Sequence, residues 1–516
     1  MTTPQKYQNK AASTSEKLTL ETHSGDQVEI TTELVRKMSS PGAPRKLAID
    51  LARDCLTDTD TGVPTAIWVE QGVGDNGTWF VYRAGHWHAM GSKQFANGPL
   101  AALIEDDSLV YKASDGTDKP FIARARLLSE LEGFLMVELG GYLAEDKPGA
   151  CLKGAPAEFE ARSGRLIPFA NGLYDYVTGE LLSHTPAVFY THLPAYDYDP
   201  DATCPQWEEF ISQTFAHDTN GALALQEYFG YVLSGRIDLQ KAFMLIGPPR
   251  AGKGVITRVL GELVGNVAAT TLISLARDQF ALAPLERAGL ITLADMRGTP
   301  SQISACSGVL LEVIAGDPVS INVKNRPHRQ AVLPGRIFAC SNELPEFRDN
   351  SQALASRFIY AKLVEGHLGK EDPTLAARLL AELPGIAQWA LQGLRRLNEQ
   401  GRFTTPDTMA ELKEEALATT SPMLTFLEDT YEITGAVDDT LPVSEVQAAY
   451  RQWAEDTGAA NVVPRDKLIK RINALALRGV VAKQTKPTTG PRQRIVTGLK
   501  PRISGSAGWT RPAFNR

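Results

Sequence analysis

The chain has 516 residues, 43% of them hydrophobic and 22% charged, which is typical of soluble globular proteins with about three to four domains. No apolar run approaches the ~20 residues that a membrane-spanning helix needs, and the N-terminus lacks an apolar signal region, so we expect a cytoplasmic protein with no membrane partner. Five cysteines without a C-x-x-C pair argue against a disulfide framework and a zinc site.

The net charge of −7 is unevenly distributed along the chain. Residues 465–516 contain 13 Lys and Arg and a single acid, Asp466, for a net charge of +12, which leaves −19 on the rest. Because a local basic patch neutralises phosphates whatever the sign of the total, this tail predicts a nucleic-acid partner. A solvated basic tail is the alternative.

Residues 1–150 form a mixed α+β region whose role the sequence leaves open. Residues 64–90 contain three apolar segments rich in aromatic and β-branched residues, which predict strands. His86 and His88 lie in the last of them, and no further metal ligand follows at a recognisable spacing. We therefore expect both histidines to be surface strand residues.

Residues 151–235 predict a β segment and a helical stretch. Residues 165–200 contain short apolar segments separated by turn residues, a pattern that predicts short strands. From Trp207 to Leu233 the apolar residues recur at helical spacing. We interpret this stretch as a helical collar in front of the next domain.

Residues 236–400 change to short apolar runs separated by helical segments, which indicates buried strands of an α/β sheet. The runs are AFMLIG at 242–247, LITLAD at 290–295 and RIFACSN at 336–342. A helical stretch rich in Leu and Ala follows to about residue 400.

The most specific motif is GPPRAGKG at 247–254, between a predicted strand and a predicted helix, which is the context of a P-loop. Glycines allow backbone N–H groups to converge on phosphate oxygens, and the helix N-terminus adds partial positive charge. Lys253 would supply a cation to the β and γ phosphates. The predicted ATP-binding residues are Gly247, Pro248, Pro249, Arg250, Ala251, Gly252, Lys253, Gly254 and Val255.

The motif departs from the usual P-loop at one position. Gly254 stands where a Ser or Thr hydroxyl normally binds magnesium, and the nearest hydroxyl is that of Thr257. Asp295 ends a predicted buried strand, where a carboxylate is suited to hold Mg²⁺ beside a P-loop. We therefore predict magnesium on Asp295, with or without Thr257.

The sequence does not identify the group that activates the attacking water. Many ATPases carry a water-orienting glutamate directly after the acid of the second strand, but this chain has Met296 there. The base could be Asp295 itself, or Glu312 or Asp317 from elsewhere.

Two further polar residues follow the third predicted strand. Asn342 ends that strand, where its amide could contact the γ-phosphate or its water. Arg357, fifteen residues later, could reach the ATP of a neighbouring subunit, and such arginine fingers contribute roughly 10³–10⁵-fold in rate. A structural salt bridge is the alternative for Arg357. The predicted catalytic set is Lys253, Asp295, Asn342 and Arg357.

Together these residues resemble superfamily-three helicases of the phage and plasmid primase-helicase family, related to the poxvirus primase-helicase. The likeness is carried by GPPRAGKG, QFALAPL ahead of ITLADMR, AGDPVSINVKNRP, FACSNELPEFRDNSQALASRF and LAELPGIAQWALQGLRRL, over about residues 165–400 and more loosely to 500. It implies an AAA+-like core in a hexameric ring, with Lys253 and Asp295 on one side of the ATP and Arg357 from the next subunit. It also implies that Asn342 is a polar sensor.

The resemblance implies a hairpin at 321–329 that lines a central channel for single-stranded DNA. Lys324, Arg326 and Arg329 in this segment are suited to grip a phosphate backbone without reading bases. A solvated basic loop is the alternative.

The C-terminal part begins with a connector at 401–422 and ends in a basic tail at 501–516. Residues 423–500 predict helices and a two-stranded basic ribbon, and they resemble a winged helix that binds duplex DNA. The candidate recognition helix is 466–477, with Lys467, Lys470 and Arg471, and the wing carries Lys483, Lys486, Arg492 and Arg494.

The predicted fold class is α/β, with an AAA+-like P-loop core, a mixed α+β N-terminal region, a helical collar and a C-terminal winged helix. The predicted function is an ATP-dependent DNA helicase that uses ATP and Mg²⁺ in replication of a phage, plasmid or other mobile element. The residues at 254 and 296 motivate an alternative, a nucleotide-gated DNA-binding initiator with little turnover. A P-loop kinase would explain neither the basic C-terminal module nor the segment from Asn342 to Arg357.

The family often carries a primase on the N-terminal side. Metal-dependent nucleotidyl transfer would need two alternating aspartates at the end of a strand, whereas LAIDLARD places Asp50 and Asp54 four residues apart, as on a helix surface. Priming is therefore not predicted.

Overall fold

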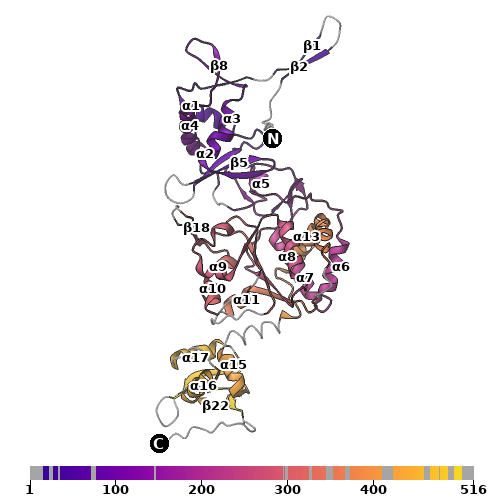
Figure 1. Ribbon diagram of the computed structural model, residues 1–516, viewed down its shortest axis with the longest axis vertical. Helices are drawn as coiled ribbons and strands as arrows, with labels where there is room; N and C mark the ends of the chain where they lie inside the picture. Colours follow the sequence, from indigo (N-terminus) through magenta and orange to yellow (C-terminus); the bar gives the residue numbers. More distant parts are fainter. Residues whose placement is uncertain are drawn as a thin grey trace.

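The computed structural model describes residues 16–21, 27–32, 35–70, 77–143, 147–294, 296, 300–324, 328–343, 352–366, 372–409, 422–457, 465–475, 477–485 and 493–502. The elements lie in three tiers along the longest axis of the molecule (Figure 1). No helix in these ranges combines the length and the apolar character that spanning a membrane requires.

The first elements of the N-terminal tier surround an antiparallel meander. The strands of this part of the tier are β1 (Glu16–Glu21), β2 (Gln27–Thr32), β3 (Arg36–Met38), β4 (Ala66–Glu70), β5 (Gly77–Arg83), β6 (His86–Met90), β7 (Leu109–Lys112) and β8 (Asp118–Pro120). Its helices are α1 (Pro44–Asp54), α2 (Ser92–Phe95), η1 (Ala96–Leu100), α3 (Ala101–Ile104) and α4 (Ala125–Glu138). Strands β4, β5 and β6 pair in sequence order, which confirms the strands predicted for 64–90.

Helix α1 confirms the helical interpretation of LAIDLARD. Asp50 and Asp54 both form ion pairs with Arg53, at 3.2 Å and 2.6 Å. His86 and His88 lie on β6 with their rings 4.0 Å apart, and the described residues include no group of three His, Cys, Asp or Glu that could hold a metal ion.

Short strands complete the N-terminal tier. They are β9 (Ala150–Cys151), β10 (Leu166–Phe169), β11 (Gly172–Asp175), β12 (Leu181–Leu182) and β13 (Val188–Phe189), with the helix α5 (Ala157–Glu160). Strands β10, β11 and β12 form an antiparallel sheet, which confirms the prediction for 165–200. Trp87 of β6 is fully buried and donates from Nε1 to the carbonyl of Val188, so the meander shares a core with β13. Ile167 and Phe169 of β10 instead join the cluster that contains α7 and α8.

The central tier is built on a parallel sheet. Its described strands are β14 (Ala242–Ile246), β15 (Val267–Thr270), β16 (Leu290–Leu293), β19 (Arg336–Ser341) and β20 (Phe358–Lys362), in the spatial order β15-β16-β19-β14-β20. The three predicted apolar runs are therefore neighbouring buried strands, and the α/β prediction is confirmed. Strand β19 lies between β14 and β16 and pairs with both in parallel.

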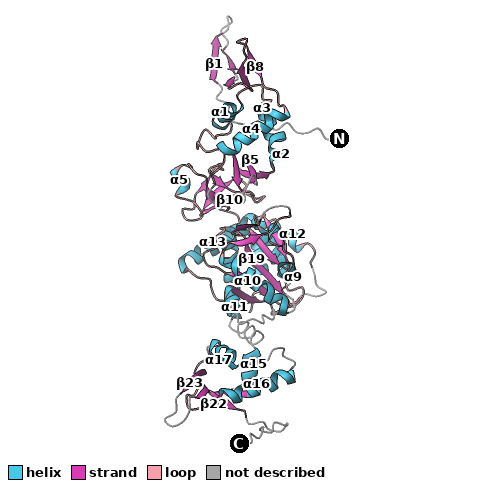
Figure 2. Ribbon diagram, turned by 90° about the vertical axis from the view of Figure 1, so that its left-hand side faces the viewer, coloured by secondary structure: helices cyan, strands magenta, loops and turns pink. Residues whose placement is uncertain are grey.

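Helices cover both faces of this sheet (Figure 2). They are α6 (Pro205–Thr214), α7 (Thr219–Leu233), α8 (Lys253–Val264), α9 (Leu272–Arg277), η2 (Ala283–Leu285), α10 (Pro300–Ala315), α11 (Gln352–Arg357), α12 (Leu375–Leu380) and α13 (Leu383–Gln400), and a hairpin of β17 (Val319–Ile321) and β18 (Arg329–Ala331) follows α10. Alternate residues of β14 point to opposite faces, because side chains alternate along a strand. Phe243 joins the cluster that contains α7, α8 and α13, and Met244 joins the cluster that contains α9 and α10.

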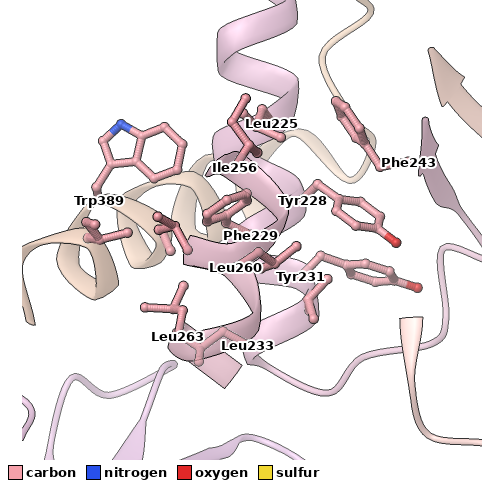
Figure 3. Close-up of a cluster of buried hydrophobic side chains, with 14 of the residues drawn as sticks. Leu225, Tyr228, Phe229, Tyr231, Leu233, Phe243, Ile256, Leu260, Leu263 and Trp389 are labelled. Atoms are coloured by element: carbon pink, nitrogen blue, oxygen red, sulfur yellow. The ribbon is translucent and has the colours of Figure 1, made fainter. Parts of the chain in front are cut away.

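The first of these clusters holds the predicted helical stretch against the sheet. Figure 3 shows Tyr228 and Phe229 of α7 beside Ile256 and Leu260 of α8, with Trp389 of α13 on the far side. Helices α6 and α7 confirm the helical prediction for this stretch.

A buried ion pair joins α7 to α13. Glu227 is fully buried and accepts a hydrogen bond from Nε of Arg396 at 2.7 Å. We expect Glu227→Ala to destabilise the central tier by about 1–3 kcal/mol, because it removes an acceptor from the partly buried Arg396 and from the backbone N–H of Thr404. Urea unfolding followed by tryptophan fluorescence measures this loss. The matched control Glu130→Ala removes an exposed pair with Arg126 and should change the midpoint little; an equal shift in both variants would contradict the expectation.

The C-terminal tier combines helices with an antiparallel ribbon. Its elements are α15 (Pro422–Thr430), β21 (Tyr431–Ile433), β22 (Thr440–Pro442), α16 (Val443–Thr457), α17 (Arg465–Ala474), β23 (Val481–Thr485), β24 (Gln493–Thr497) and β25 (Leu499–Pro501). Strands β23 and β24 are antiparallel as predicted, but β22 also pairs with β24, so the predicted two-stranded ribbon is part of a three-stranded sheet. The helix predicted to reach residue 477 ends at Ala474 instead. Asn473 exchanges two hydrogen bonds with the backbone of Ala482, and Gly479 takes a left-handed conformation that turns the chain into β23.

Candidate functional site: the loop at the carboxyl end of β14

The loop from Gly247 to Gly252 joins β14 to α8 at the carboxyl edge of the sheet. Arg250 and Gly252 take left-handed backbone conformations, with φ of 63° and 90°, and α8 begins at Lys253. The first N–H groups of a helix have no partner inside the helix and carry its positive end. The loop therefore presents a turn of backbone donors that is suited to a phosphate.

Lys253 extends from the first turn of α8 back across this loop. Its Nζ donates to the carbonyls of Gly247 at 2.6 Å and Pro248 at 2.8 Å and to Oδ1 of Asn342 at 3.0 Å. These bonds use all three protons of the ammonium group. Asn342 directly follows β19, so the structure brings together two predicted catalytic residues from neighbouring strands.

Burial lowers the pKa of the Lys253 ammonium from its ordinary value. A lysine with a lowered pKa keeps its charge below that pKa and loses it as the pH rises through it. We therefore expect the affinity for ATP to fall at a pH below the ordinary lysine pKa of about 10.4, which binding of a fluorescent ATP analogue measures. Lys253→Arg stays charged in this range and serves as the control. A flat pH profile in the wild-type protein would contradict the assignment.

The chain after β20 supports the loop from behind. The backbone N–H of Leu363 donates to the carbonyl of Ile246 at 2.7 Å. A Cβ at Gly247 would lie 2.5 Å from the carbonyl oxygen of Leu363, and one at Gly366 would lie 2.9 Å from that of Pro249. Glycine is required at both positions because backbone meets backbone there. The sequence analysis did not single out residues 363–366, although the apolar run before them, FIYAKL, could have marked another buried strand.

The option that Thr257 holds magnesium is not supported by its geometry. Its hydroxyl donates to the carbonyl of Lys253 at 2.9 Å and contacts Sγ of Cys340 at 3.3 Å. It therefore binds within its own helix and against β19, since threonines inside helices commonly donate to the carbonyl four residues earlier. Gly254 has no side chain to replace it. Asp295, the other predicted ligand, lies outside the described residues. The described residues thus fit a phosphate, and they supply no hydroxyl to a metal at this point.

Two of the residues considered as the water-activating base lie at the other edge of the sheet. Helix α10 carries Glu312, and its last residue, Ala315, accepts a hydrogen bond from Gln240, which precedes β14. The backbone N–H of Asp317 donates to the carbonyl of Glu312. Because the strands are parallel, this amino edge is separated from the loop by the length of β14, roughly 16 Å. Glu312 and Asp317 therefore do not serve the Lys253 site of their own chain.

Met296, at the position of the usual glutamate, is fully buried in the apolar cluster that contains α10. Its backbone N–H donates to the carbonyl of Cys340 at 3.3 Å, which continues the pairing of β16 with β19. An apolar side chain in this place cannot orient water.

Arg357 also lies at the amino edge. It ends α11 directly before β20, whose first residue pairs with Ala242, the first residue of β14. Its guanidinium donates to Oε1 of Gln240. Arg357 is therefore remote from the Lys253 of its own chain, and the structure does not bring the two together within one subunit.

A hairpin of β17 and β18 lies at the predicted place, with pairs from Val319–Ala331 to Ile321–Arg329, and its contact with DNA stays a prediction. Lys324 is exposed near its tip, and Arg326 lies outside the described residues. Arg329 is an exception among the predicted cations, because its guanidinium forms an ion pair with Glu286 in which both side chains are mostly buried. Its charge is neutralised in the structure.

The C-terminal cations lie on α17 and the ribbon. Lys470 is exposed and Arg471 half-buried on α17, while Lys483 of β23 is exposed and Arg494 of β24 is half-buried. Lys467 lies in α17, but its side chain is not described, and Lys486 and Arg492 lie outside the described residues.

Two family models match the chain. One, described as D5 N terminal like, matches residues 72–216, and the other, a family of unknown function (DUF5906), matches residues 245–357. The second match spans the loop, Asn342 and Arg357. The first supports the predicted resemblance in part, at the level of a primase-helicase, and it extends the likeness upstream from residue 165 to residue 72. The superfamily-three class stays a prediction.

Solved structures show distant likenesses. The apo structure of the NrS-1 C terminal region gives a TM-score of 0.48 at 12% identity, covering 84% of this chain and 96% of that one. An A form apo structure of the same region gives a TM-score of 0.44 at 11% identity, with the same two coverages. The X-ray structure of JCV helicase gives a TM-score of 0.24 at 15% identity, covering 42% of this chain and 72% of that one.

Proposed function

We propose that the protein is an ATP-hydrolysing helicase of the superfamily-three type that acts on DNA during replication of a phage, plasmid or other mobile element. The observation that carries the proposal is the contact between Lys253 and Asn342 over a glycine-rich loop at the carboxyl ends of β14 and β19. A cation on the loop and an amide on the next strand can together bind the γ-phosphate and orient the water that attacks it. The match to the D5 N terminal like family supports the class.

The proposed chemistry assigns a separate task to each residue. The backbone N–H groups of 247–255 bind the phosphate oxygens, and the Lys253 ammonium exchanges its bonds to the loop carbonyls for bonds to the β and γ phosphates. Asn342 holds the attacking water or the γ-phosphate. Mg²⁺, when held by Asp295, would neutralise charge on the phosphates.

A ring completes the site in this proposal. Arg357 lies at the amino edge of the sheet and Lys253 at the carboxyl edge, so the two can act on one ATP only when two subunits meet head to tail. Such heterologous contacts form a ring when the rotation between subunits closes. We propose an AAA+-like core in a hexameric ring, with α6 and α7 as its collar.

Nucleic acid would contact two surfaces. The β17–β18 hairpin would present Lys324 to a single strand in the channel, and α17 with the β23–β24 ribbon would act as a winged helix on duplex DNA. Because phosphate contacts release counterions, binding by the second surface should weaken steeply with salt.

ATP hydrolysis by the full chain, with and without single-stranded DNA, tests the proposal, and strand separation of a forked duplex follows in the same preparation. We expect DNA to raise turnover and ATP to be required for unwinding. ATP-dependent turnover without any strand separation would sink the helicase assignment.

A nucleotide-gated initiator is a second candidate. It is favoured by Gly254, by the engaged hydroxyl of Thr257 and by the buried Met296, which together remove two groups that assist hydrolysis in many ATPases. Tight ATP binding with turnover near background, with or without DNA, would support this candidate over the helicase.

A further inference from the structure

Two fully buried carboxylates of α7 bind the chain that follows α13. Glu227, besides its ion pair, accepts hydrogen bonds from the backbone N–H and the hydroxyl of Thr404, both at 2.7 Å. Asp218 caps α7 by accepting from the N–H of Gly221 at 2.6 Å. It also accepts from the N–H of Asp407 at 2.9 Å and from the N–H and hydroxyl of Thr408 at 3.2 Å and 2.7 Å.

These bonds hold residues 403–409, here named the strap, across the edge of the sheet. Strand β20 is the edge strand. At one end of the strap Phe403 packs against Tyr231 and the first apolar cluster, and at the other end Met409 is buried in the second cluster, on the opposite face. The strap therefore wraps the β20 edge, which would otherwise expose unpaired backbone groups.

The strap also touches the segment that supports the nucleotide loop. The hydroxyl of Thr408 donates to Asp218 and accepts the backbone N–H of Lys362, the last residue of β20, at 3.4 Å. The carbonyl of Lys362 accepts a hydrogen bond from Nε2 of His217 at 2.6 Å. Residue 363 follows directly and contacts the loop at Ile246 and Gly247. A continuous set of contacts thus runs from Thr408 to the phosphate-binding loop.

Burial opposes ionisation of Asp218, but the hydrogen bonds from Asp407, Thr408 and Gly221 outweigh it and lower the pKa of this carboxyl. Asp218 is therefore charged at neutral pH, and charge-assisted hydrogen bonds are the stronger ones. The charged carboxylate therefore holds the strap at the hydroxyl of Thr408, which also accepts from β20.

We propose that the strap couples DNA binding by the C-terminal module to the nucleotide loop, with Asp218 and Thr408 as positioning residues. The proposal rests on the proposed function, because it assumes that the loop binds ATP and that residues 422–502 bind DNA. Met409 is the last described residue before that module along the chain, so the strap is the described part of the core that leads into it. Coupling of this kind is reciprocal, since each ligand must change the affinity of the other by the same factor.

The test measures the affinity of the full chain for a fluorescent ATP analogue with and without a duplex oligonucleotide, the DNA form proposed for the C-terminal module. Thr408→Val keeps the shape of the side chain and removes the hydroxyl that joins Asp218 to Lys362. We expect DNA to change the wild-type affinity by a factor of roughly 5–150. In Thr408→Val this factor should approach one, while the affinity for each ligand alone stays within about twofold of wild type.

Two further variants separate coupling from folding. Thr408→Ser keeps the hydroxyl and should restore the coupling. Thr374→Val removes an exposed threonine hydroxyl that binds Asp372 at 2.6 Å and no strap residue, and should leave the coupling unchanged.

Each remaining outcome has a definite meaning. The role of the strap is overturned if Thr408→Val keeps the wild-type coupling. It is also overturned if Thr374→Val loses as much coupling as Thr408→Val does. Wild-type protein that binds ATP with the same affinity in the presence of DNA also overturns it, and leaves nucleotide binding intact. Wild-type protein that binds no ATP overturns the proposed function itself, and the inference with it.

Discussion

Lys253→Ala is expected to reduce ATP turnover by about 10²–10³-fold, the loss usually seen when one preorganised donor to a developing negative charge is removed. The ammonium is the cation that directly faces both the loop carbonyls and Asn342, so alanine removes charge where phosphate would bind. Steady-state hydrolysis with saturating single-stranded DNA measures the effect.

The matched control for this substitution is Lys119→Ala, in the N-terminal tier. Lys119 lies on β8, and its Nζ pairs with Asp115 at 2.9 Å on the surface. This variant loses the same charge and volume, and it should keep turnover within about threefold of wild type because no phosphate contact is removed. Similar losses in both variants would place the nucleotide elsewhere.

Arg357→Ala is expected to reduce turnover by roughly 10³–10⁵-fold, as the loss of an arginine finger does, although Arg357 lies at the edge of the sheet opposite the loop of its own chain. A more specific result is expected when the Lys253→Ala and Arg357→Ala proteins are mixed. Subunits with Lys253→Ala supply an intact Arg357, and subunits with Arg357→Ala supply an intact loop. If subunits exchange freely, about a quarter of the interfaces in an equimolar ring combine the two intact halves.

Recovery of turnover on mixing the two inactive variants therefore demonstrates a site shared between subunits. Arg357→Lys keeps a cation that can still reach the Gln240 side chain, and it controls for loss of the local contact. Two inactive variants that stay inactive when mixed, under conditions where subunit exchange is shown by labelled protein, would contradict the composite site.

Much of the fold was predictable from local pattern. The strands of 242–246, 290–293 and 336–341, the helices of 205–233 and the C-terminal ribbon all fall within the predicted segments. Each depends on residues that are neighbours in the sequence, since apolar runs and helical spacing decide which face is buried. The end of α17 was missed because the side chain of Asn473 binds β23, a contact that no local pattern shows.

The site was predictable in part for the same reason. The loop was recognisable from its glycines and lysine, and Asn342 from its place at the end of an apolar run. The strap was not recognisable, because its anchors Asp218 and Glu227 lie on a helix more than 170 residues before it in the chain. Buried carboxylates on a helix carry no signal of their partners until the helix is packed.

The sequence by itself determined the chemistry that is available: a cation on a glycine-rich loop, an amide after a strand, and a basic C-terminal module. Only the tertiary structure decided which groups meet. It brought Lys253 to Asn342 across 89 positions, turned the Thr257 hydroxyl into its own helix and neutralised Arg329 with Glu286. It also placed Arg357 at the far edge of the sheet. The physical reason is that the order of parallel strands and the packing of helices on them are set by contacts between distant segments, which local periodicity does not specify.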